Sequence, residues 1–153
     1  MQSARALAKT GCLLIQFPGK ISFDYFTQVE QLLDCISSNN PHQLWRLAVQ
    51  FRSADWYTAE TVELLNQYGA SLVLHDIAKG KNKTLYTQAP FVYCRYHGPA
   101  GDYRGSYSAL FLQQQAVKIK QWLTDGKDVY AYFNNTIGDA FQNAMALRSL
   151  VEE

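Results

Sequence analysis

Cysteine is scarce in this sequence, long apolar runs are missing and net charge is almost zero, and each shortage excludes a class of protein. The three cysteines, Cys12, Cys35 and Cys94, are odd in number and include no Cys-x-x-Cys pair. This pattern argues against both a disulfide framework and a zinc knuckle. Because each cysteine lies in an apolar stretch, we expect reduced thiols in or near the core.

Charge and hydropathy argue against two kinds of partner, nucleic acid and membranes. Fourteen Lys and Arg residues stand against thirteen Asp and Glu residues, a net charge of +1. Such a chain has no overall field to attract nucleic acid or an acidic membrane surface. The apolar run at residues 12–15 is too short for a signal peptide or a membrane span. We therefore expect a cytoplasmic protein with neither nucleic acid nor membrane as partner.

What the sequence does contain is an alternation of strand and helix patterns. Its 153 residues, 48% of them hydrophobic, suit a single domain spanning residues 1–153. Short β-branched and aromatic runs predict five strands, at residues 12–17, 44–51, 70–75, 91–97 and 129–135. The connections are long enough for right-handed crossovers, so the sheet should be parallel. This order predicts an α/β fold, a β/α barrel or a large part of one.

Capping residues and apolar spacing place the helices between these strands. Helical patterns cover residues 3–9, 22–36, 58–68, 108–123 and 140–151, whereas residues 77–89 predict a loop with at most a short helix. Ser22 and Thr58 are suitable N-caps, and Gly69 stands where a glycine ends a helix. Thr136 and Asp139 have the spacing of a capping box for the last helix.

Polar side chains stand at the carboxyl ends of the predicted strands. In a β/α barrel these ends converge on one face and usually form the site. Alternatively, the same groups hydrogen-bond one another and satisfy a buried rim. The candidates are Gln16, Gln50, Arg52, Asp76, Arg95, His97, Asn134 and Asn135.

The strand at residues 91–97 carries the chemistry that could be catalytic. Arg95 and His97 alternate with Tyr96, so both should point to the same face of the sheet. If the protein is an enzyme, His97 is the predicted acid or base, and Arg95 stabilises negative charge. Asp76 completes the predicted catalytic set. The alternative is a histidine that only closes a strand end onto backbone groups.

A glycine-rich loop after this strand predicts an anion site. Gly98, Gly101 and Gly105 could leave backbone amides open to a ligand, with Arg95 and Arg104 beside them. A helix follows directly, and phosphate binds near the last loops of many barrels. The competing interpretation is that these glycines only form turns.

The sequence gives little indication of a metal site or of aromatic residues that stack on nucleic bases. His75, Asp76 and His97 are potential ligands, but no pair has the close spacing of a helical metal motif, so we predict neither a metal nor another cofactor. The aromatic residues of the last strand alternate within it, which favours packing over base stacking.

At this level of detail the chain resembles the YecE-like family, also called domain of unknown function 72. The resemblance covers the chain almost end to end. Its motifs are Leu14-Ile-Gln-Phe-Pro18, Val49-Gln-Phe-Arg52 with Trp56, Leu72-Val-Leu-His-Asp76, Val92-Tyr-Cys-Arg-Tyr-His-Gly-Pro99, Tyr103-Arg-Gly-Ser-Tyr107, and Val129-Tyr-Ala-Tyr-Phe-Asn-Asn135 with Asn143-Ala144.

The resemblance implies a TIM-like β/α barrel of which this chain supplies strands four to eight. Family members carry about three further strand–helix units ahead of the matched part. The family pattern Val-Glu-Phe-Arg-His becomes Val-Gln-Phe-Arg-Ser here, with Gln50 at the carboxylate position and Ser53 at the histidine position. A neutral amide is neither a general base nor an anionic metal ligand.

Two functional hypotheses follow from these observations. The first is a pocket for a small polar or anionic ligand, sugar-like or phosphorylated, with Arg95 and His97 as principal contacts and Arg104 and Gly105 in the ligand set. The second is a truncated or decayed paralogue that acts as a non-catalytic binding or interaction module. Five strands leave two open edges. We therefore expect a homo-oligomer, or a missing N-terminal half encoded upstream of Met1.

Overall fold

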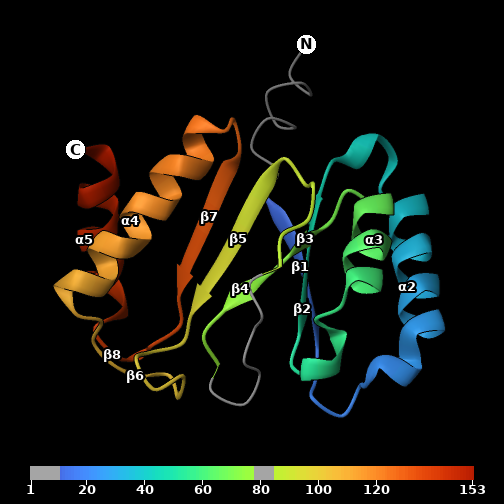
Figure 1. Cartoon of the computed structure of the whole chain (residues 1–153), viewed down its shortest axis with the longest axis horizontal. Coiled ribbons are helices and arrows are strands. Elements are labelled where there is room, and N and C mark those ends of the chain that lie inside the picture. The colour runs from blue at the N-terminus through green and yellow to red at the C-terminus, as the bar shows by residue number, and fades with distance from the viewer. Residues whose placement is uncertain (1–10, 78–84) are drawn as a thin grey trace. The chain divides into compact units, whose positions relative to one another are not determined.

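The computed structural model describes residues 11–77 and 85–153, which form a mixed α/β fold with parallel strands (Figure 1). The chain divides into two compact units. The described part of unit 1 is residues 11–72 and 85–89, and that of unit 2 is residues 73–77 and 90–153. Whether they behave as the single domain expected from the sequence stays a prediction.

Unit 1 consists of three parallel strands with two helices. Its sheet has the order β1-β2-β3, and Gln16 of β1 lies opposite Gln50 of β2. In chain order the elements are β1 (Cys12–Phe17), η1 (Phe23–Tyr25), α2 (Phe26–Ser38), η2 (Pro41–Gln43), β2 (Arg46–Phe51), η3 (Ala54–Trp56), α3 (Ala59–Gln67) and β3 (Ser71–Leu72).

The core of unit 1 is apolar and aromatic. Alternate residues of β2, among them Val49 and Phe51, are buried with α2 and α3. Trp56 is fully buried, with its ring stacked on Phe51 at 4.2 Å between centroids. Its indole N–H donates to the Ile21 carbonyl over 2.8 Å, which satisfies the one polar atom of the side chain.

Unit 2 repeats the strand and helix pattern and adds a small ribbon. Its main sheet has the order β4-β5-β7, all parallel, and β6 pairs with β8 in a separate two-stranded sheet. The elements are β4 (Leu74–His75), β5 (Phe91–Tyr96), β6 (Arg104–Gly105), α4 (Ala109–Thr124), β7 (Asp128–Phe133), β8 (Ile137–Gly138) and α5 (Ala140–Glu152).

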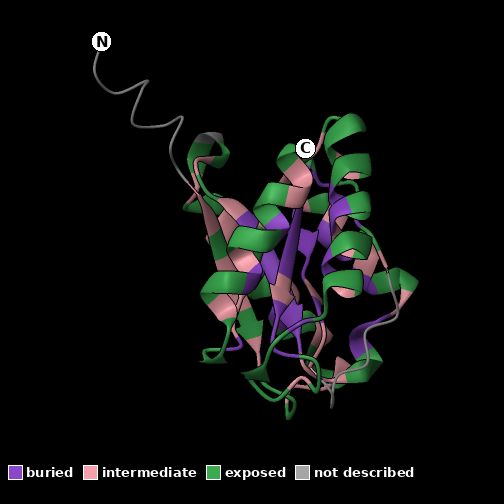
Figure 2. Ribbon diagram, turned by 90° about the vertical axis from the view of Figure 1, so that its left-hand side faces the viewer, coloured by how far each residue is buried: buried purple, intermediate pink, exposed green. Residues whose placement is uncertain are grey.

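One face of the unit 2 sheet is covered by α4 and α5. Val92, Cys94 and Tyr96 of β5 form a buried cluster with Leu112 of α4 and Leu147 of α5. Figure 2 shows buried strands beside helices whose outer surfaces are exposed. Since strand side chains alternate, the odd-numbered residues of β5 must point to the opposite face, which we call the helix-free face.

Several expected helix boundaries are confirmed. Thr58 caps α3, its hydroxyl accepting from the Thr61 amide, and Ser108 caps α4 in the same way through Phe111. Gly69 follows α3 with a φ of 60°, a conformation that favours glycine. The helix expected at residues 3–9 lies outside the described residues, as do residues 78–84 of the expected loop.

Other expectations were wrong. Residues 70–75 do not form one strand, because β3 pairs with β2 and β4 pairs with β5. Residues 11–77 and 85–153 contain no closed barrel, and the partial barrel expected from the sequence stays a prediction. Thr136 does not cap α5, which begins after Asp139, because the chain first pairs β8 with β6. Cys35 is exposed on α2 rather than near a core.

None of the helices in the described ranges is long and apolar enough to cross a membrane.

Candidate functional site

The polar cluster of unit 2 is centred on His97, the residue after β5. This side chain is 0% exposed. Its Nδ1 lies 3.2 Å from Oδ1 of Asp76, and its Nε2 lies 3.2 Å from Nδ2 of Asn134. Since an amide nitrogen can only donate, Nε2 is the acceptor and the ring proton belongs on Nδ1, toward Asp76. Protein groups thus occupy both nitrogens.

Asp76 connects the members of this cluster through hydrogen bonds to both of its carboxylate oxygens. Its Oδ1 also accepts from the His97 backbone amide over 2.6 Å, and its Oδ2 accepts from the hydroxyl of Tyr107. Burial alone would raise the pKa of Asp76, but the hydrogen bonds from His97 and Tyr107 outweigh it and lower the pKa. The carboxylate is therefore ionised and fixed in direction, yet its side chain remains 30% exposed.

Tyr107 connects Asp76 to the loop that follows β5. Its hydroxyl donates to Asp76 and accepts from the Gly98 amide over 2.6 Å. Burial, followed by the neighbouring carboxylate, raises the pKa of Tyr107, so the phenol keeps its proton. The tyrosine is thus a hydrogen-bond donor that holds Asp76 in place.

Asparagines fix the surrounding ribbon. Asn143 of α5 accepts at Oδ1 from the Tyr107 amide over 3.1 Å and from Nδ2 of Asn135 over 3.0 Å. Asn143 also donates to Ser106, and Asn135 donates to the Gly105 carbonyl. Asn135 therefore links α5 to the ribbon of β6 and β8, and its role as a ligand contact stays a prediction.

The glycine loop differs from the anion cradle expected from the sequence. The Gly98 amide donates to Tyr107, and the Gly101 amide donates to the Gly98 carbonyl, so neither is open to an anion. Gly98 has a φ of 106°, and a Cβ there would lie 2.3 Å from the Arg104 carbonyl oxygen. This glycine is required by backbone approach, and the amides of Gly98 and Gly101 already have protein partners, whereas anion binding beside Arg104 and Gly105 stays a prediction.

Aromatic rings line the helix-free face below the polar cluster. Tyr93 of β5 stacks on Tyr132 of β7 at 4.9 Å between centroids, and Phe91 meets Tyr130 edge to face at 5.9 Å. Tyr132 lies opposite Arg95 in the sheet, and Arg95 lies opposite His75 of β4. On this face of the sheet, aromatic side chains are therefore followed by charged and polar side chains at the strand ends.

The predicted site residues fall into three sets. His97, Asp76 and Asn134 are brought together by hydrogen bonds, and Arg95 shares the helix-free face with His97. Arg104 and Gly105 lie exposed in β6. The remaining candidates belong to unit 1 and are described there: Gln16 and Gln50 are neighbours in the sheet, and Arg52 directly follows β2.

Sequence reasoning missed the supporting roles of Tyr107 and Asn143. Both lie in motifs that carry the family resemblance, but neither stands at a strand end, the position that indicates a site in a parallel sheet. No group of three or more His, Cys, Asp or Glu side chains placed to hold a metal occurs in the part of the chain that the structure describes.

Comparison with known proteins identifies the family. The family model described as "Protein of unknown function DUF72" matches residues 1–153. The chain belongs to this family. The YecE-like resemblance seen in the sequence is therefore confirmed, since the two names denote the same family. No curated protein matches the chain.

Two solved DUF72 structures resemble this chain. A DUF72 family protein from Thermotoga maritima MSB8 is 25% identical, with a TM-score of 0.65 over 92% of this chain and 57% of that one. One from Enterococcus faecalis V583 is 19% identical, with a TM-score of 0.73 over 93% of this chain and 61% of that one. The chain thus spans less than two thirds of either DUF72 structure.

Proposed function

We propose that the strand ends of unit 2 bind a small polar or anionic ligand, sugar-like or phosphorylated. The observation that carries this proposal is the oriented Asp76 carboxylate, ionised and still 30% exposed although three protein donors hold it. The exposed part of this carboxylate can accept a hydrogen bond from a ligand hydroxyl. Arg95 supplies positive charge on the same side of the sheet.

In this proposal the ligand contacts are Asp76, Arg95 and Asn134, and the Tyr132 ring offers a surface for stacking. His97 is a positioning residue, because it is buried and both ring nitrogens face protein groups. That assignment differs from the catalytic role expected from the sequence. It favours ligand binding without catalysis by His97.

Acid–base catalysis is the other candidate, and one observation favours it. The Asp76 carboxylate accepts from Nδ1 of His97, which orients the ring and leaves Nε2 as the nitrogen that could accept a proton. A substrate would have to displace the Asn134 amide to reach that nitrogen. Arg95 would then stabilise developing negative charge.

A partial TIM-like β/α barrel is the architecture we propose for this site. All strand pairs in the described residues are parallel, and the DUF72 structures match nearly the whole chain. In such a barrel the helix-free face would be the interior, with the strand ends at its mouth.

Titration with inorganic phosphate, glucose and glucose 6-phosphate tests the proposal. A ligand that binds only the folded protein raises the melting temperature, so phosphate should do so beyond a chloride control of equal ionic strength. Arg95→Gln should abolish the shift, whereas Lys120→Gln, which removes an exposed charge on α4, should retain it. No shift and no calorimetric heat with any probe at millimolar concentration would refute ligand binding.

A further inference from the structure

The loop after β5 holds one residue in a conformation that its side chain opposes. Four residues of this loop have a positive φ: Gly98 at 106°, Gly101 at 67°, Tyr103 at 69° and Gly105 at 77°. Glycine adopts this conformation without strain, whereas a bulky residue is destabilised in it. The three glycines therefore agree with the local backbone, and Tyr103 is the exception.

Backbone hydrogen bonds hold Tyr103 in this conformation from both sides. Its amide donates to the His97 carbonyl over 2.5 Å, and its carbonyl accepts from the Ile137 amide over 3.0 Å. Tyr103 thus joins the end of β5 to the start of β8. A glycine at this position would form the same two bonds without strain, so they do not explain why a tyrosine is present. The reason has to lie in its side chain.

The side chain of Tyr103 belongs to the polar cluster. Its ring stands perpendicular to the imidazole of His97, with 5.3 Å between centroids and 89° between planes. Asp76 and Asn134 contact the two nitrogens of the same imidazole, so three side chains surround one buried histidine. Tyr103 is nevertheless 36% exposed, and the Asp76 side chain is 30% exposed. An aromatic ring and a carboxylate therefore both contact His97 and both reach solvent.

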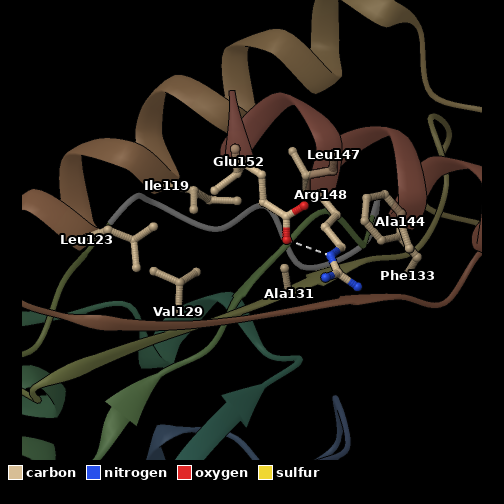
Figure 3. A pocket seen from close by; sticks show the side chains of 10 residues that line it. Ile119, Leu123, Val129, Ala131, Phe133, Ala144, Leu147, Arg148 and Glu152 are labelled. Carbon is tan, nitrogen blue, oxygen red and sulfur yellow. Dashed lines mark hydrogen bonds and ion pairs between the residues drawn. The ribbon is translucent and has the colours of Figure 1, made fainter.

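The apolar groove of unit 2 offers a different environment. It has a volume of about 300 Å³ and lies between β7, α4 and α5, on the helix-covered face of the sheet (Figure 3). Val129 and Phe133 belong to its lining, and its two charged residues, Arg148 and Glu152, pair with each other over 2.7 Å. A ligand with many hydroxyl groups would lose hydrogen bonds with water there. The cluster around His97 combines an aromatic ring with polar groups and suits such a ligand better.

We propose that Tyr103 is a specificity-determining contact for a sugar ring, an inference that rests on the proposed function of the unit 2 strand ends and deepens it. A pyranose has apolar C–H faces and a rim of hydroxyl groups. One C–H face packs on the tyrosine ring, and hydroxyl groups donate to the Asp76 carboxylate. The strain at position 103 is tolerated because glycine would provide no ring. A phosphate group on the sugar is bound by Arg95 and does not depend on Tyr103.

Three substitutions at position 103 separate the ring from the strain. Tyr103→Phe keeps both, Tyr103→Ala removes the ring and keeps the positive φ, and Tyr103→Gly removes the ring and the strain. Calorimetric titration with glucose 6-phosphate should give Tyr103→Phe a Kd within about threefold of the wild type, whereas Tyr103→Ala and Tyr103→Gly should bind roughly tenfold more weakly. Inorganic phosphate, which has no C–H face, should bind all four proteins equally.

Thermal unfolding of the same variants measures the strain. Tyr103→Gly should melt about 2 °C or more above Tyr103→Ala, because glycine adopts a positive φ freely. The matched control is Tyr25→Ala, which removes a ring that is 45% exposed in unit 1 and should leave both affinities unchanged. Tyr103→Gly melting below Tyr103→Ala would contradict the strained conformation on which the inference stands.

The titrations also distinguish this inference from the proposed function. Equal affinity of the wild type and Tyr103→Ala for glucose 6-phosphate would overturn the sugar contact and mean that the ring only covers His97. A parallel loss of phosphate binding in Tyr103→Ala would mean that the whole cluster is disturbed, which also overturns a specific contact. A wild type that binds phosphate but not glucose 6-phosphate would overturn the sugar contact alone. Binding of neither probe would overturn the proposed function together with it.

Discussion

The two units share one construction and differ in what their strand ends carry. In unit 1, the end of β2 leads into Trp56, which stacks within an aromatic core. In unit 2, the end of β5 leads into His97, which is held by Asp76 and Asn134. Parallel strands covered by helices therefore do not dictate a polar site. After β2 the chain passes Arg52 and then buries the Trp56 ring, whereas after β5 the first residue, His97, is itself hydrogen-bonded.

The largest effect is expected from the packed strand end. Trp56→Ala should lower the free energy of unfolding by about 3 to 5 kcal/mol, because it removes a fully buried ring and its hydrogen bond to Ile21. Urea unfolding followed by circular dichroism measures it. Trp45→Ala, at an exposed position of the same unit, should change stability by less than about 0.5 kcal/mol. Equal losses in both variants would contradict the aromatic core.

A second large effect is expected at Gly98, where the loop after β5 lies close to the Arg104 backbone. Gly98→Ala should cost at least about 2 kcal/mol, since its Cβ would collide with the Arg104 backbone and its φ is positive. Gly11→Ala meets nothing within 4 Å and should be neutral. A stable Gly98→Ala protein with unchanged amide exchange in the loop would show that this close approach is not maintained.

An intermediate effect is expected at the polar strand end. Asp76→Asn should cost about 1 to 3 kcal/mol at pH 7, because His97 and Tyr107 lose an ionised acceptor. The folded-state pKa of Asp76 is lowered, so its contribution is complete above the ordinary carboxyl pKa. It is lost as pH falls through the lowered value, that is, below about pH 4.

Unfolding curves recorded from pH 7 to acid pH measure this dependence of stability on pH. The wild type and the Asp76→Asn variant should converge in stability on acidification. Asp34→Asn, at an exposed position of α2, should run parallel to the wild type throughout. A constant difference between wild type and Asp76→Asn across this range would mean that the carboxylate is not stabilised by its neighbours.

The smallest expected effect is the loss of a helix N-cap, which should destabilise both units equally. Thr58→Ala and Ser108→Ala each remove a side-chain acceptor from the first turn of a helix, and each should cost about 1 kcal/mol. Thermal unfolding of the two variants compares them directly. A clearly larger loss at Ser108 would indicate that the α4 cap also supports the Tyr107 network beside it.

Local signals predicted the helices and most strands well. Thr58 and Gly69 act through neighbouring backbone groups, which a sequence shows directly, whereas Ser22 does not cap α2, which begins at Phe26. The break at Val73 and the pairing of β6 with β8 depend on which distant segments meet, and no local pattern contains that information. The predicted capping box at Thr136 does not form for this reason. The chain there pairs as β8 with the distant strand β6, and α5 begins only after Asp139.

The candidate site was predicted in part for the same reason. Asp76, His97 and Asn134 stand at strand ends, so the period of two and the parallel order were sufficient to group them. Burial of His97 and the use of the Gly98 amide by Tyr107 could not be foreseen, because both depend on a loop that returns to the strand end. That return buries His97 and gives both of its ring nitrogens protein partners.

A nuclear magnetic resonance titration with glucose 6-phosphate tests the central claim, that the polar strand end of unit 2 is a ligand site. Backbone amide shifts should change most at Asp76, Arg95 and Asn134 and should saturate. Arg95→Gln should remove the changes without unfolding the protein. Shifts confined to α4 and α5, or none at millimolar ligand, would mean that this cluster only stabilises the fold.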